Sequence, residues 1–287
     1  LPCPLAPLPP SSLPVEHSPI EPFPQFQPRP MADLKAIIFD VDGTLAENER
    51  YGHRVAFNQA FEAAGLTWHW SPELYSELLQ VAGGKERIRF FVERYAPPMS
   101  AIADWDTFVA TLHQAKTQHY AGLLASGQIG LRPGVQRLIT AARQAHIRLA
   151  IATTSRLENV LTLLTQTLAP EAPQWFEVIA AGDVVLQKKP AADIYHYVLD
   201  QLALDAQYCL AIEDTEHGLT AATQAGLTSV IAVTDYTRTQ NFAAAACVLT
   251  HLGDPHNPCQ VLSGPTLTQG YFDLAIAESL LPHQPPA

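Results

Sequence analysis

Short apolar runs alternate with longer amphipathic segments along most of the chain. The runs that could form buried strands lie at 35–40, 147–153, 178–181, 208–214, 228–233 and 247–249. Segments with apolar residues at helical spacing separate the later runs, at 156–167, 190–202 and 215–225. Strands that alternate with helices need crossover connections, and these favour a parallel sheet. The pattern therefore predicts an α/β fold with a doubly wound, Rossmann-like parallel sheet.

One long interval lacks this alternation. Residues 46–125 contain four segments with apolar residues three or four positions apart, and no strong strand interrupts them. The interval falls between the first and second candidate strands. We therefore predict an all-helical cap domain over 46–125, inserted into a catalytic core made of 31–45 and 126–250.

The two ends of the chain do not share these patterns. Residues 1–30 hold eleven of the 24 prolines and resemble neither a secretory signal nor a transit peptide. Proline at this density sustains neither a helix nor a sheet ladder, so we predict a disordered, proline-rich leader. Met31 is the first methionine and a candidate start of the protein. Prolines and glycines punctuate residues 251–287, a C-terminal tail whose packing the pattern does not predict.

The charge balance limits which partners the chain can bind. Asp and Glu number 28 against 17 Lys and Arg, a net charge of −11. Nucleic-acid-binding domains present a cationic face, which disfavours that class. A small phosphorylated substrate stays compatible, because a few local cations and a metal can invert the field within one cleft.

The cysteines and the hydropathy indicate the cellular compartment in which the protein is expected. The four cysteines show no CxxC spacing and read as reduced thiols, and no apolar run approaches the ~18 residues of a membrane span. We expect a cytoplasmic protein, or one of the plastid stroma if the source is a photosynthetic eukaryote. We also expect no membrane partner and a monomeric or weakly oligomeric state.

The first candidate strand ends in a carboxylate. Asp40 closes the run KAIIFD, and Asp42 and Gly43 follow it. In an open α/β sheet, ligands bind beyond the carboxyl ends of the strands. Two carboxylates so close together favour a divalent cation with oxygen ligands, for which Mg²⁺ is the default. One can act as the nucleophile and form an aspartyl phosphate while the other moves a proton. A plain turn built from Asp and Gly explains the same residues when they are taken alone.

Polar residues also follow three later elements. Thr153 ends the second strand, Lys188 and Lys189 precede a proline, and Glu213 with Asp214 end a further strand. Each has a simple structural explanation by itself. In this order, as a nucleophilic Asp, a hydroxyl, a lysine and acidic metal ligands, they resemble the haloacid dehalogenase superfamily.

A closer resemblance covers residues 34–250. Its segments are FDVDGTLAENE, GGKERI, HQAKT, LRPGV, IATTSRLENV, FEVIAAGD, KKPAADIY and EDTEHGL, and they resemble the CbbY-type phosphatases. This resemblance implies a Mg²⁺-dependent enzyme of the Calvin cycle. Such an enzyme removes one phosphate from a ketopentose bisphosphate that would otherwise inhibit the carbon-fixing carboxylase.

The resemblance also implies roles for individual residues. Asp40 would be the nucleophile and Asp42 the acid and base, with Thr153 and Lys189 completing the catalytic set. Mg²⁺ would be held by Asp40, the carbonyl of Asp42 and Asp214, with Glu213 close by. The residues expected to approach the substrate are Glu49, His53, Gly83, Gly84, Lys85, Glu86, Arg87, His113, Lys116, Thr153, Thr154, Ser155, Asn159 and Lys189. Thr215 stands where relatives often have serine, which preserves the hydroxyl.

Spacing supports some of the cap residues, with alternatives left open. Glu49 and His53 are four apart and share one helical face, although a surface ion pair explains them equally well. Gly83 and Gly84 permit close approach to a ligand beside the cations Lys85 and Arg87, but a plain helix–helix turn would too. His113 and Lys116 are three apart and share a face, with solvated polar residues as the alternative.

These observations lead to a functional expectation with four rivals. We expect a sugar-bisphosphate phosphatase that converts xylulose 1,5-bisphosphate to xylulose 5-phosphate. A phosphosugar mutase of the β-phosphoglucomutase type has the same core and stays open, as does a phosphatase for another small sugar phosphate. A catalytically silent binding module is disfavoured because the set of chemical residues is intact. Dehalogenation is disfavoured because a halide leaving group does not need the proton that Asp42 would supply.

Overall fold

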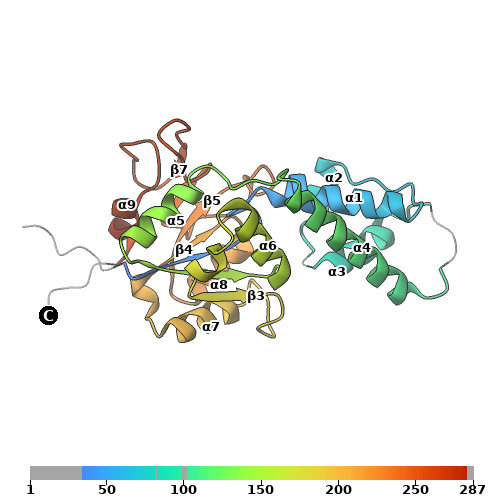
Figure 1. Ribbon diagram of the computed structural model, residues 1–287, viewed down its shortest axis with the longest axis horizontal. Helices are drawn as coiled ribbons and strands as arrows, with labels where there is room; N and C mark the ends of the chain where they lie inside the picture. The colour runs from blue at the N-terminus through green and yellow to red at the C-terminus, as the bar shows by residue number, and fades with distance from the viewer. Residues whose placement is uncertain (1–33, 82, 99–101, 283–287) are drawn as a thin grey trace, which may run out of the picture. The chain divides into compact units, whose positions relative to one another are not determined.

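The computed structural model describes residues 34–81, 83–98 and 102–282 (Figure 1). The chain divides into two units, residues 1–31 and 32–287. The predicted disordered leader, residues 1–30, and Met31 lie outside the described residues, so both interpretations stay predictions.

A seven-stranded sheet forms the centre of the second unit. Its strands are β1 (Ala36–Phe39), β2 (Arg148–Thr153), β3 (Val178–Ala181), β4 (Cys209–Glu213), β5 (Thr228–Ala232), β6 (Cys247–Leu249) and β7 (Val261–Ser263). The order is β3-β2-β1-β4-β5-β6-β7, and all neighbours are parallel except β6 and β7. Strand β1 lies between β2 and β4, so the order reverses direction there. This confirms the doubly wound parallel sheet, and the six strands predicted from the sequence all form.

Alternating residues of β1 pack on opposite faces of the sheet. Ile37 and Phe39 join the cluster that contains α5 (Val135–Gln144) and α6 (Leu157–Thr167). Ala36 and Ile38 join the cluster formed with the second pair of helices, α7 (Asp193–Leu202) and α8 (Glu216–Gln224) (Figure 1). Successive side chains of a strand point to opposite faces, so a strand covered on both sides is apolar throughout. This explains why the strands read as continuous apolar runs.

The described part of the chain between β1 and α5 is helical. It contains the π-helix η1 (Glu49–His53) and four α-helices: α1 (Arg54–Ala63), α2 (Pro72–Leu78), α3 (Gly84–Tyr95) and α4 (Trp105–Ala125). These helices share an aromatic core that includes Phe57, Phe61, Trp68, Trp70, Tyr75 and Phe91. Side-chain caps begin two of them, because Ser71 accepts from the N–H of Leu74 and Asp104 from that of Thr107. The helical cap predicted from the sequence is therefore present, while its exact boundaries stay a prediction.

The C-terminal segment packs on the sheet and on α5. Strand β7 pairs antiparallel with β6, and α9 (Leu274–Leu280) contacts α5. Phe272 is fully buried, and Arg137 of α5 donates to its carbonyl (2.7 Å). Two short 3₁₀ turns, η2 (Ala172–Trp175) and η3 (Ala206–Tyr208), complete the elements that the structure describes. The pattern of the sequence did not predict how this segment packs.

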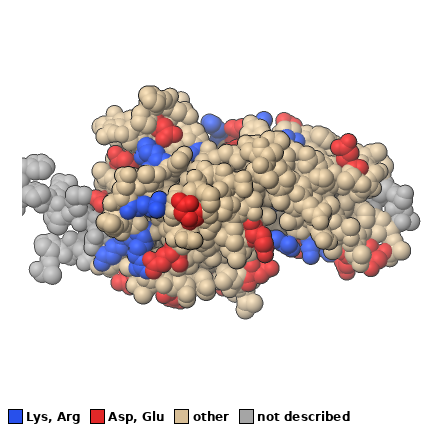
Figure 2. Space-filling view, viewed as in Figure 1, with Lys and Arg blue, Asp and Glu red and all other residues tan. Residues whose placement is uncertain are grey.

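Surface charge and helix length are consistent with the composition. Figure 2 shows acidic and basic side chains interspersed over one face among many uncharged residues. In the part of the chain that the structure describes, none of the helices combines the length and the hydropathy that crossing a membrane requires.

Candidate active site

Three neighbouring strands deliver polar side chains to one edge of the sheet. Asp40 follows β1, Thr153 ends β2 and Glu213 ends β4. Because β1 pairs in parallel with both β2 and β4, these carboxyl ends lie side by side. Lys189, from the loop before α7, reaches the same edge and contacts Asp40. The structure thus brings together the catalytic and acidic residues expected from the sequence.

The ammonium group of Lys189 is buried and fully paired. Its Nζ donates to Oδ1 of Asp40 (2.8 Å), to the carbonyl of Ala152 (2.8 Å) and to Oε1 of Glu213. A lysine has three N–H donors, so all of them are used. Burial lowers the pKa of Lys189, but the carboxylates of Asp40 and Glu213 outweigh burial and raise it well above its usual range. Lys189 is therefore a cation at neutral pH.

Glu213 serves as the acceptor that fixes this lysine. Oε1 also accepts from the Tyr195 hydroxyl (2.8 Å), and Oε2 accepts from the main-chain N–H of Asp214 (3.1 Å). A Cβ added at Gly218 would overlap the Glu213 carboxylate, so only glycine leaves room for it. Both oxygens of Glu213 are thus occupied by protein donors. The sequence had placed Glu213 among the acids close to a metal, and its contacts suit it better to holding Lys189.

Asp40, Glu213 and Asp214 form a cluster of three acids, of which Asp40 and Glu213 share the single ammonium group of Lys189. One ligand atom from each lies within 4.8 Å of the others. Burial raises the pKa of Asp40 to about 8 and the pKa of Asp214 well above its usual range. Oδ1 of Asp214 is buried and has no hydrogen-bond partner among the residues described. Three carboxylates around one lysine, with an unpartnered buried oxygen, fit a hard divalent cation.

Gly43 explains how the loop after β1 can approach these acids. Its φ is +90°, a conformation that favours glycine, and a Cβ at this position would overlap the Asp214 carboxylate. The glycine of the DVDGT motif is therefore required by close packing against Asp214, and not only by the bend of the chain.

Asp42 has a different environment from Asp40. It accepts hydrogen bonds from Asn48 Nδ2 and Ser155 Oγ, and His53 Nε2 lies 3.2 Å from its Oδ1. Burial raises its pKa, but His53 and the Ser155 hydrogen bond outweigh burial and lower the pKa to about 2. Asp42 is therefore ionised. Sequence reasoning missed Asn48, whose only signal was a position six residues after Asp42 within the motif-bearing loop.

Lys116 and His53 continue the hydrogen-bond chain from Asp42 into the cap. Nζ of Lys116 lies 2.9 Å from Nδ1 of His53, and the centroids of the His53 and Tyr120 rings lie 4.1 Å apart. An ammonium only donates, so Nδ1 accepts and Nε2 carries the proton that faces Asp42. Burial lowers the pKa of Lys116 to about 8. The spacing predicted that His113 and Lys116 share one helical face. In the structure Lys116 contacts His53.

His113 lies beside the start of α3. A Cβ added at Gly84 would come within 2.6 Å of the His113 ring, so this glycine makes room for it. Burial, with the nearby cation Lys116, lowers the pKa of His113 to about 4. His113 is therefore neutral at pH 7 and could offer a hydrogen bond, but no charge, to an anion.

A cavity of about 430 Å³ joins this edge of the sheet to the cap. Of the residues predicted to form the site, it is lined by Asp40, Asp42, Glu49, Gly83, Arg87, Thr154, Lys189 and Asp214. Its lining does not include the predicted residues His53, Gly84, Lys85, Glu86, His113, Lys116, Thr153, Ser155, Asn159 and Glu213. Several of these act from behind the lining, as His53 and Ser155 do on Asp42. For Asn159, in the first turn of α6, the structure gives only a main-chain hydrogen bond to Arg156 (3.1 Å).

A tyrosine links two cap residues on the wall of this cavity. The Tyr75 hydroxyl donates to Oε2 of Glu49 (2.6 Å) and accepts from Nη1 of Arg87 (2.9 Å). Nη2 of Arg87 donates to the carbonyl of Val81 (3.3 Å). Sequence reasoning missed Tyr75, because an aromatic residue on the apolar face of a helix reads as core. The wall therefore carries an acid and a cation held in fixed positions.

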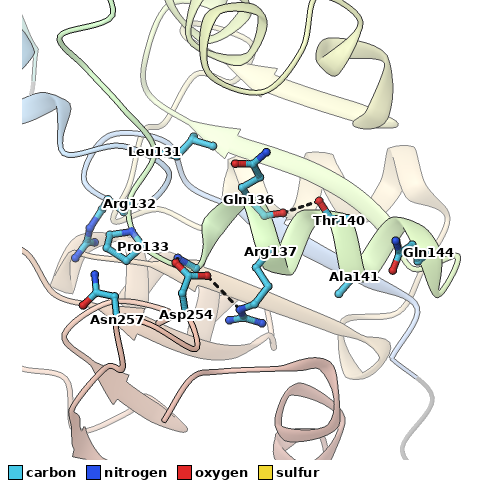
Figure 3. Close-up of a pocket in the computed structure, with 11 residues that line it drawn as sticks. Leu131, Arg132, Pro133, Gln136, Arg137, Thr140, Ala141, Gln144, Asp254 and Asn257 are labelled. Atoms are coloured by element: carbon cyan, nitrogen blue, oxygen red, sulfur yellow. Dashed lines mark hydrogen bonds and ion pairs between the residues drawn. The ribbon is translucent and has the colours of Figure 1, made fainter. Parts of the chain in front are cut away.

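A larger cavity of about 610 Å³ lies beside α5 and does not contain this chemistry (Figure 3). Its lining includes Arg132, Arg137 and Asp254 but none of the clustered acids. Size alone does not identify a reaction centre, whereas convergent polar groups with shifted pKa values do. The smaller cavity is therefore the candidate active site.

Comparisons with known proteins identify the family of the chain. Residues 34–226 match the family model of the haloacid dehalogenase-like hydrolases. The chain is 50% identical over 213 residues to protein CbbY of Rhodobacter capsulatus, which covers 74% of this chain and 91% of that protein. It is 43% identical over 225 residues to the plasmid-encoded CbbY of Cupriavidus necator, covering 78% of this chain and 88% of that protein.

Two solved structures of CbbY from Rhodobacter sphaeroides are also similar. One is a complex with phosphate, with a TM-score of 0.69 and 44% identity, covering 76% of this chain and 94% of that chain. The other is a mutant in complex with xylulose-(1,5)bisphosphate, with a TM-score of 0.70 and 43% identity, covering 77% of this chain and 96% of that chain.

Proposed function

The chain belongs to the haloacid dehalogenase-like hydrolases and is a phosphatase for phosphate monoesters, and we propose that it converts xylulose 1,5-bisphosphate to xylulose 5-phosphate. The cavity between sheet and cap carries this proposal. On one side it presents Asp40 and Lys189, and on the other Glu49 and Arg87. A relative 43% identical to this chain binds xylulose-(1,5)bisphosphate, which supports the choice of substrate.

The acidic cluster supports Mg²⁺ as the cofactor. Asp40, Asp214 and the main-chain carbonyl of Asp42 would hold it, because Glu213 already accepts from protein donors. When bound, the ion supplies positive charge that neutralises the phosphoryl oxygens.

Asp40 is the proposed nucleophile. One of its carboxylate oxygens attacks phosphorus, the bond from phosphorus to the sugar oxygen breaks, and an aspartyl phosphate forms. Lys189 holds Asp40 in place, and its positive charge opposes the negative charge that collects on the phosphoryl group. Thr153, at the end of β2, lies at the same edge, where its hydroxyl can bond a phosphoryl oxygen.

Asp42 is the proposed acid and base. The leaving sugar oxygen needs a proton, and a carboxylate with a pKa near 2 holds none at neutral pH. The geometry offers a source, because the Nε2 proton of His53 can pass to Asp42 as Nδ1 takes one from Lys116. In the second step Asp42 is a carboxylate again and takes a proton from the water that cleaves the phosphoenzyme.

A substrate panel tests the proposal. The purified protein with Mg²⁺ is offered xylulose 1,5-bisphosphate, xylulose 5-phosphate, another pentose bisphosphate and glucose 1-phosphate, and phosphate and sugar products are measured. We expect the highest kcat/KM for xylulose 1,5-bisphosphate, with one phosphate released per xylulose 5-phosphate formed. Isomerisation without phosphate release would instead identify a mutase, and equal rates on all substrates would overturn the choice of sugar. A sugar with two phosphate groups carries roughly three to four negative charges at neutral pH. Such an anion does not cross a lipid bilayer, which favours a cytoplasmic enzyme.

Replacement of the nucleophile provides the control. Asp40→Asn should lower phosphate release by roughly 10⁴-fold or more, because an amide cannot attack phosphorus. The melting temperature of the metal-free variant should not fall, since burial already favours the neutral form of Asp40. Substantial turnover by the pure variant would remove Asp40 from the role of nucleophile.

A further inference from the structure

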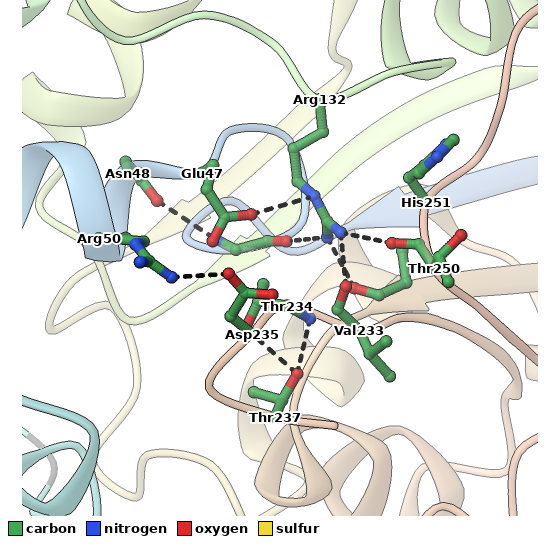
Figure 4. A network of polar contacts seen from close by, with 12 residues as sticks. Glu47, Asn48, Arg50, Arg132, Val233, Thr234, Asp235, Thr237, Thr250 and His251 are labelled. Atoms are coloured by element: carbon green, nitrogen blue, oxygen red, sulfur yellow. Dashed lines mark hydrogen bonds and ion pairs between the residues drawn. The ribbon is translucent and has the colours of Figure 1, made fainter. Parts of the chain in front are cut away.

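Arg132 lies in the loop before α5 and is nearly buried, with 8% of its surface exposed. Its guanidinium donates to four main-chain carbonyls: Gly43, Ala232 (2.6 Å), Val233 (2.6 Å) and Thr250 (2.9 Å). These carbonyls come from three separate places, namely the loop after β1, the end of β5 and the end of β6. Arg132 therefore ties the loop that bears the aspartates to the far half of the sheet (Figure 4).

The backbone next to Arg132 holds the same loop. The main-chain N–H of Arg132 donates to the carbonyl of Leu45 (2.8 Å), and Leu131 forms an antiparallel bridge with Ala46. Nε of Arg132 lies 3.5 Å from Oε2 of Glu47. Every N–H of the guanidinium thus faces an oxygen. Two of them, on Nη1 and Nε, act on the segment between residues 43 and 47, and the main-chain N–H of Arg132 acts on the same segment.

The contact with Gly43 links Arg132 to the acids. Gly43 follows Asp42 and packs directly against the Asp214 carboxylate. We propose that Arg132 is a positioning residue that fixes the Gly43 carbonyl and so sets where Asp42 and Asp214 meet around the divalent cation. This inference rests on the proposed function, because it assigns the loop to a metal-dependent phosphatase.

The shape of arginine suits this role. A guanidinium is planar and presents five donors in fixed directions, so it can bridge carbonyls from three segments at once. A lysine brings three donors to one point and cannot span the same carbonyls. A purely structural role would also need these bonds, since unpaired buried carbonyls destabilise a fold. The test must therefore separate positioning from stability.

Arg137 offers a matched control, because it lines the same cavity beside α5 as Arg132 does. It donates to the carbonyls of Gly253 (2.9 Å) and Phe272 (2.7 Å) and lies 3.5 Å from Asp254 (Figure 3). Like Arg132 it joins main-chain segments through several bonds, but among the described residues none of its bonds reaches the loop after β1. Replacing Arg137 should therefore cost stability without disturbing the aspartates.

The experiment compares Arg132→Lys with Arg137→Lys in the full chain. Melting temperature, Mg²⁺ binding by calorimetry without substrate, and kcat and KM for the generic monoester p-nitrophenyl phosphate are measured. We expect both variants to melt at a lower temperature. Only Arg132→Lys should weaken Mg²⁺ binding, by roughly tenfold or more, and lower kcat by a similar factor with little change in KM.

Three outcomes are informative. Unchanged Mg²⁺ binding and kcat in Arg132→Lys would overturn the inference, and so would equal changes in both variants. If Arg132→Lys does not fold, Arg132→Gln with added guanidinium ion replaces it, and failure of the ion to restore any Mg²⁺ affinity would count against positioning. Neither Mg²⁺ binding nor the generic monoester depends on the choice of sugar, so failure of the proposed substrate is distinguishable from failure of this inference.

Discussion

Asp40 and Asp42 are two residues apart and have opposite electrostatic surroundings. Burial raises the pKa of Asp40 to about 8, because Lys189 is shared with Glu213 and cannot fully offset it. Asp42 receives bonds from Asn48, Ser155 and His53, and its pKa lies at about 2. Neighbouring carboxyl groups with separated pKa values usually divide the chemical roles between them. The environment of each residue thus supports different tasks for the two acids.

At the scale of single residues, we predict that Asp214→Asn raises the Mg²⁺ concentration needed for half-maximal activity by at least ~10-fold, since it removes a charged oxygen ligand. The raised pKa of Asp214 in the wild type also predicts how the stability of the metal-free protein depends on pH. In the metal-free wild type, stability is lost as pH rises and this buried group must ionise, so metal-free Asp214→Asn should melt higher at pH 8.

A titration of Mg²⁺ followed by activity and by melting temperature checks this prediction. Glu216→Gln is the control, because Glu216 lines the same cavity but is exposed. An unchanged Mg²⁺ requirement in Asp214→Asn would show that the metal site has been assigned to the wrong residues.

A second prediction concerns Lys116, whose pKa burial lowers to about 8. Between pH 8 and about 10.5 the unfolded chain holds a proton that the folded chain has lost, so wild-type stability should rise with pH there. Lys116→Met lacks this proton. Its stability relative to wild type should therefore fall from pH 7 to pH 10.5, by up to ~3 kcal/mol. Chemical denaturation at several pH values measures this, and a difference independent of pH would contradict it.

At the scale of elements, the π-helix η1 carries two residues that contact the cap and the core respectively. The spacing of Glu49 and His53 predicted one shared face of a regular helix, and the structure widens this turn into a π-helix. Glu49 then reaches Tyr75 in the cap, while His53 reaches Asp42 in the core. π-Turns occur frequently at functional sites, and this one directs two side chains to different partners.

The first turn of α3 provides a prediction about specificity. Lys85 is half-buried beside Gly83, which lines the cavity. A charge-assisted bond to a second phosphate contributes about 1.5–3 kcal/mol, so Lys85→Ala should lower kcat/KM for xylulose 1,5-bisphosphate by roughly ten- to a hundredfold. The kcat/KM for xylulose 5-phosphate should fall far less. Arg87→Ala should likewise narrow the preference for xylulose 1,5-bisphosphate over xylulose 5-phosphate.

Arg89→Ala is the matched control on the same helix. Arg89 pairs with Asp106 at 2.8 Å, and both side chains are exposed. Its loss should therefore leave kcat/KM unchanged for both sugars. Steady-state kinetics with the two sugars separate the outcomes. Equal losses on both sugars in Lys85→Ala would point to a defect in the cap, and the assignment of Lys85 to the second phosphate would have to be dropped.

At the scale of the whole molecule, the fold was predictable because it depends on a pattern of burial. Parallel strands carry their carboxyl ends to one edge whatever their side chains are, so the meeting of Asp40, Thr153, Lys189 and Asp214 followed from topology. The residues that adjust these groups were not predictable. Asn48, Tyr75 and Arg132 act through contacts made only after folding, and nothing in their local spacing distinguishes them from ordinary polar or core residues.

The C-terminal segment escaped prediction for a related reason. Strand β7 has only three residues, and its partner β6 is equally short. Phe272 is buried against a surface that exists only when the rest of the core has formed. Where a short element depends on distant partners, periodicity carries too little information to identify it.

The position of β1 in the centre of the sheet has a consequence for biosynthesis. Ala36 pairs with Arg148 and with Cys209, which are 112 (148 − 36) and 173 (209 − 36) residues farther along the chain. At about 5–20 residues per second, a ribosome needs roughly 6–22 s to make the first partner strand and roughly 9–35 s to make the second. During that time the cap helices can already pack against one another, while the apolar strand Ala36–Phe39 has no neighbouring strand to pair with. The strand that carries the nucleophile is thus made before the other strands of the sheet, yet its acidic cluster is complete only when Asp214 of the 287 residues has been added.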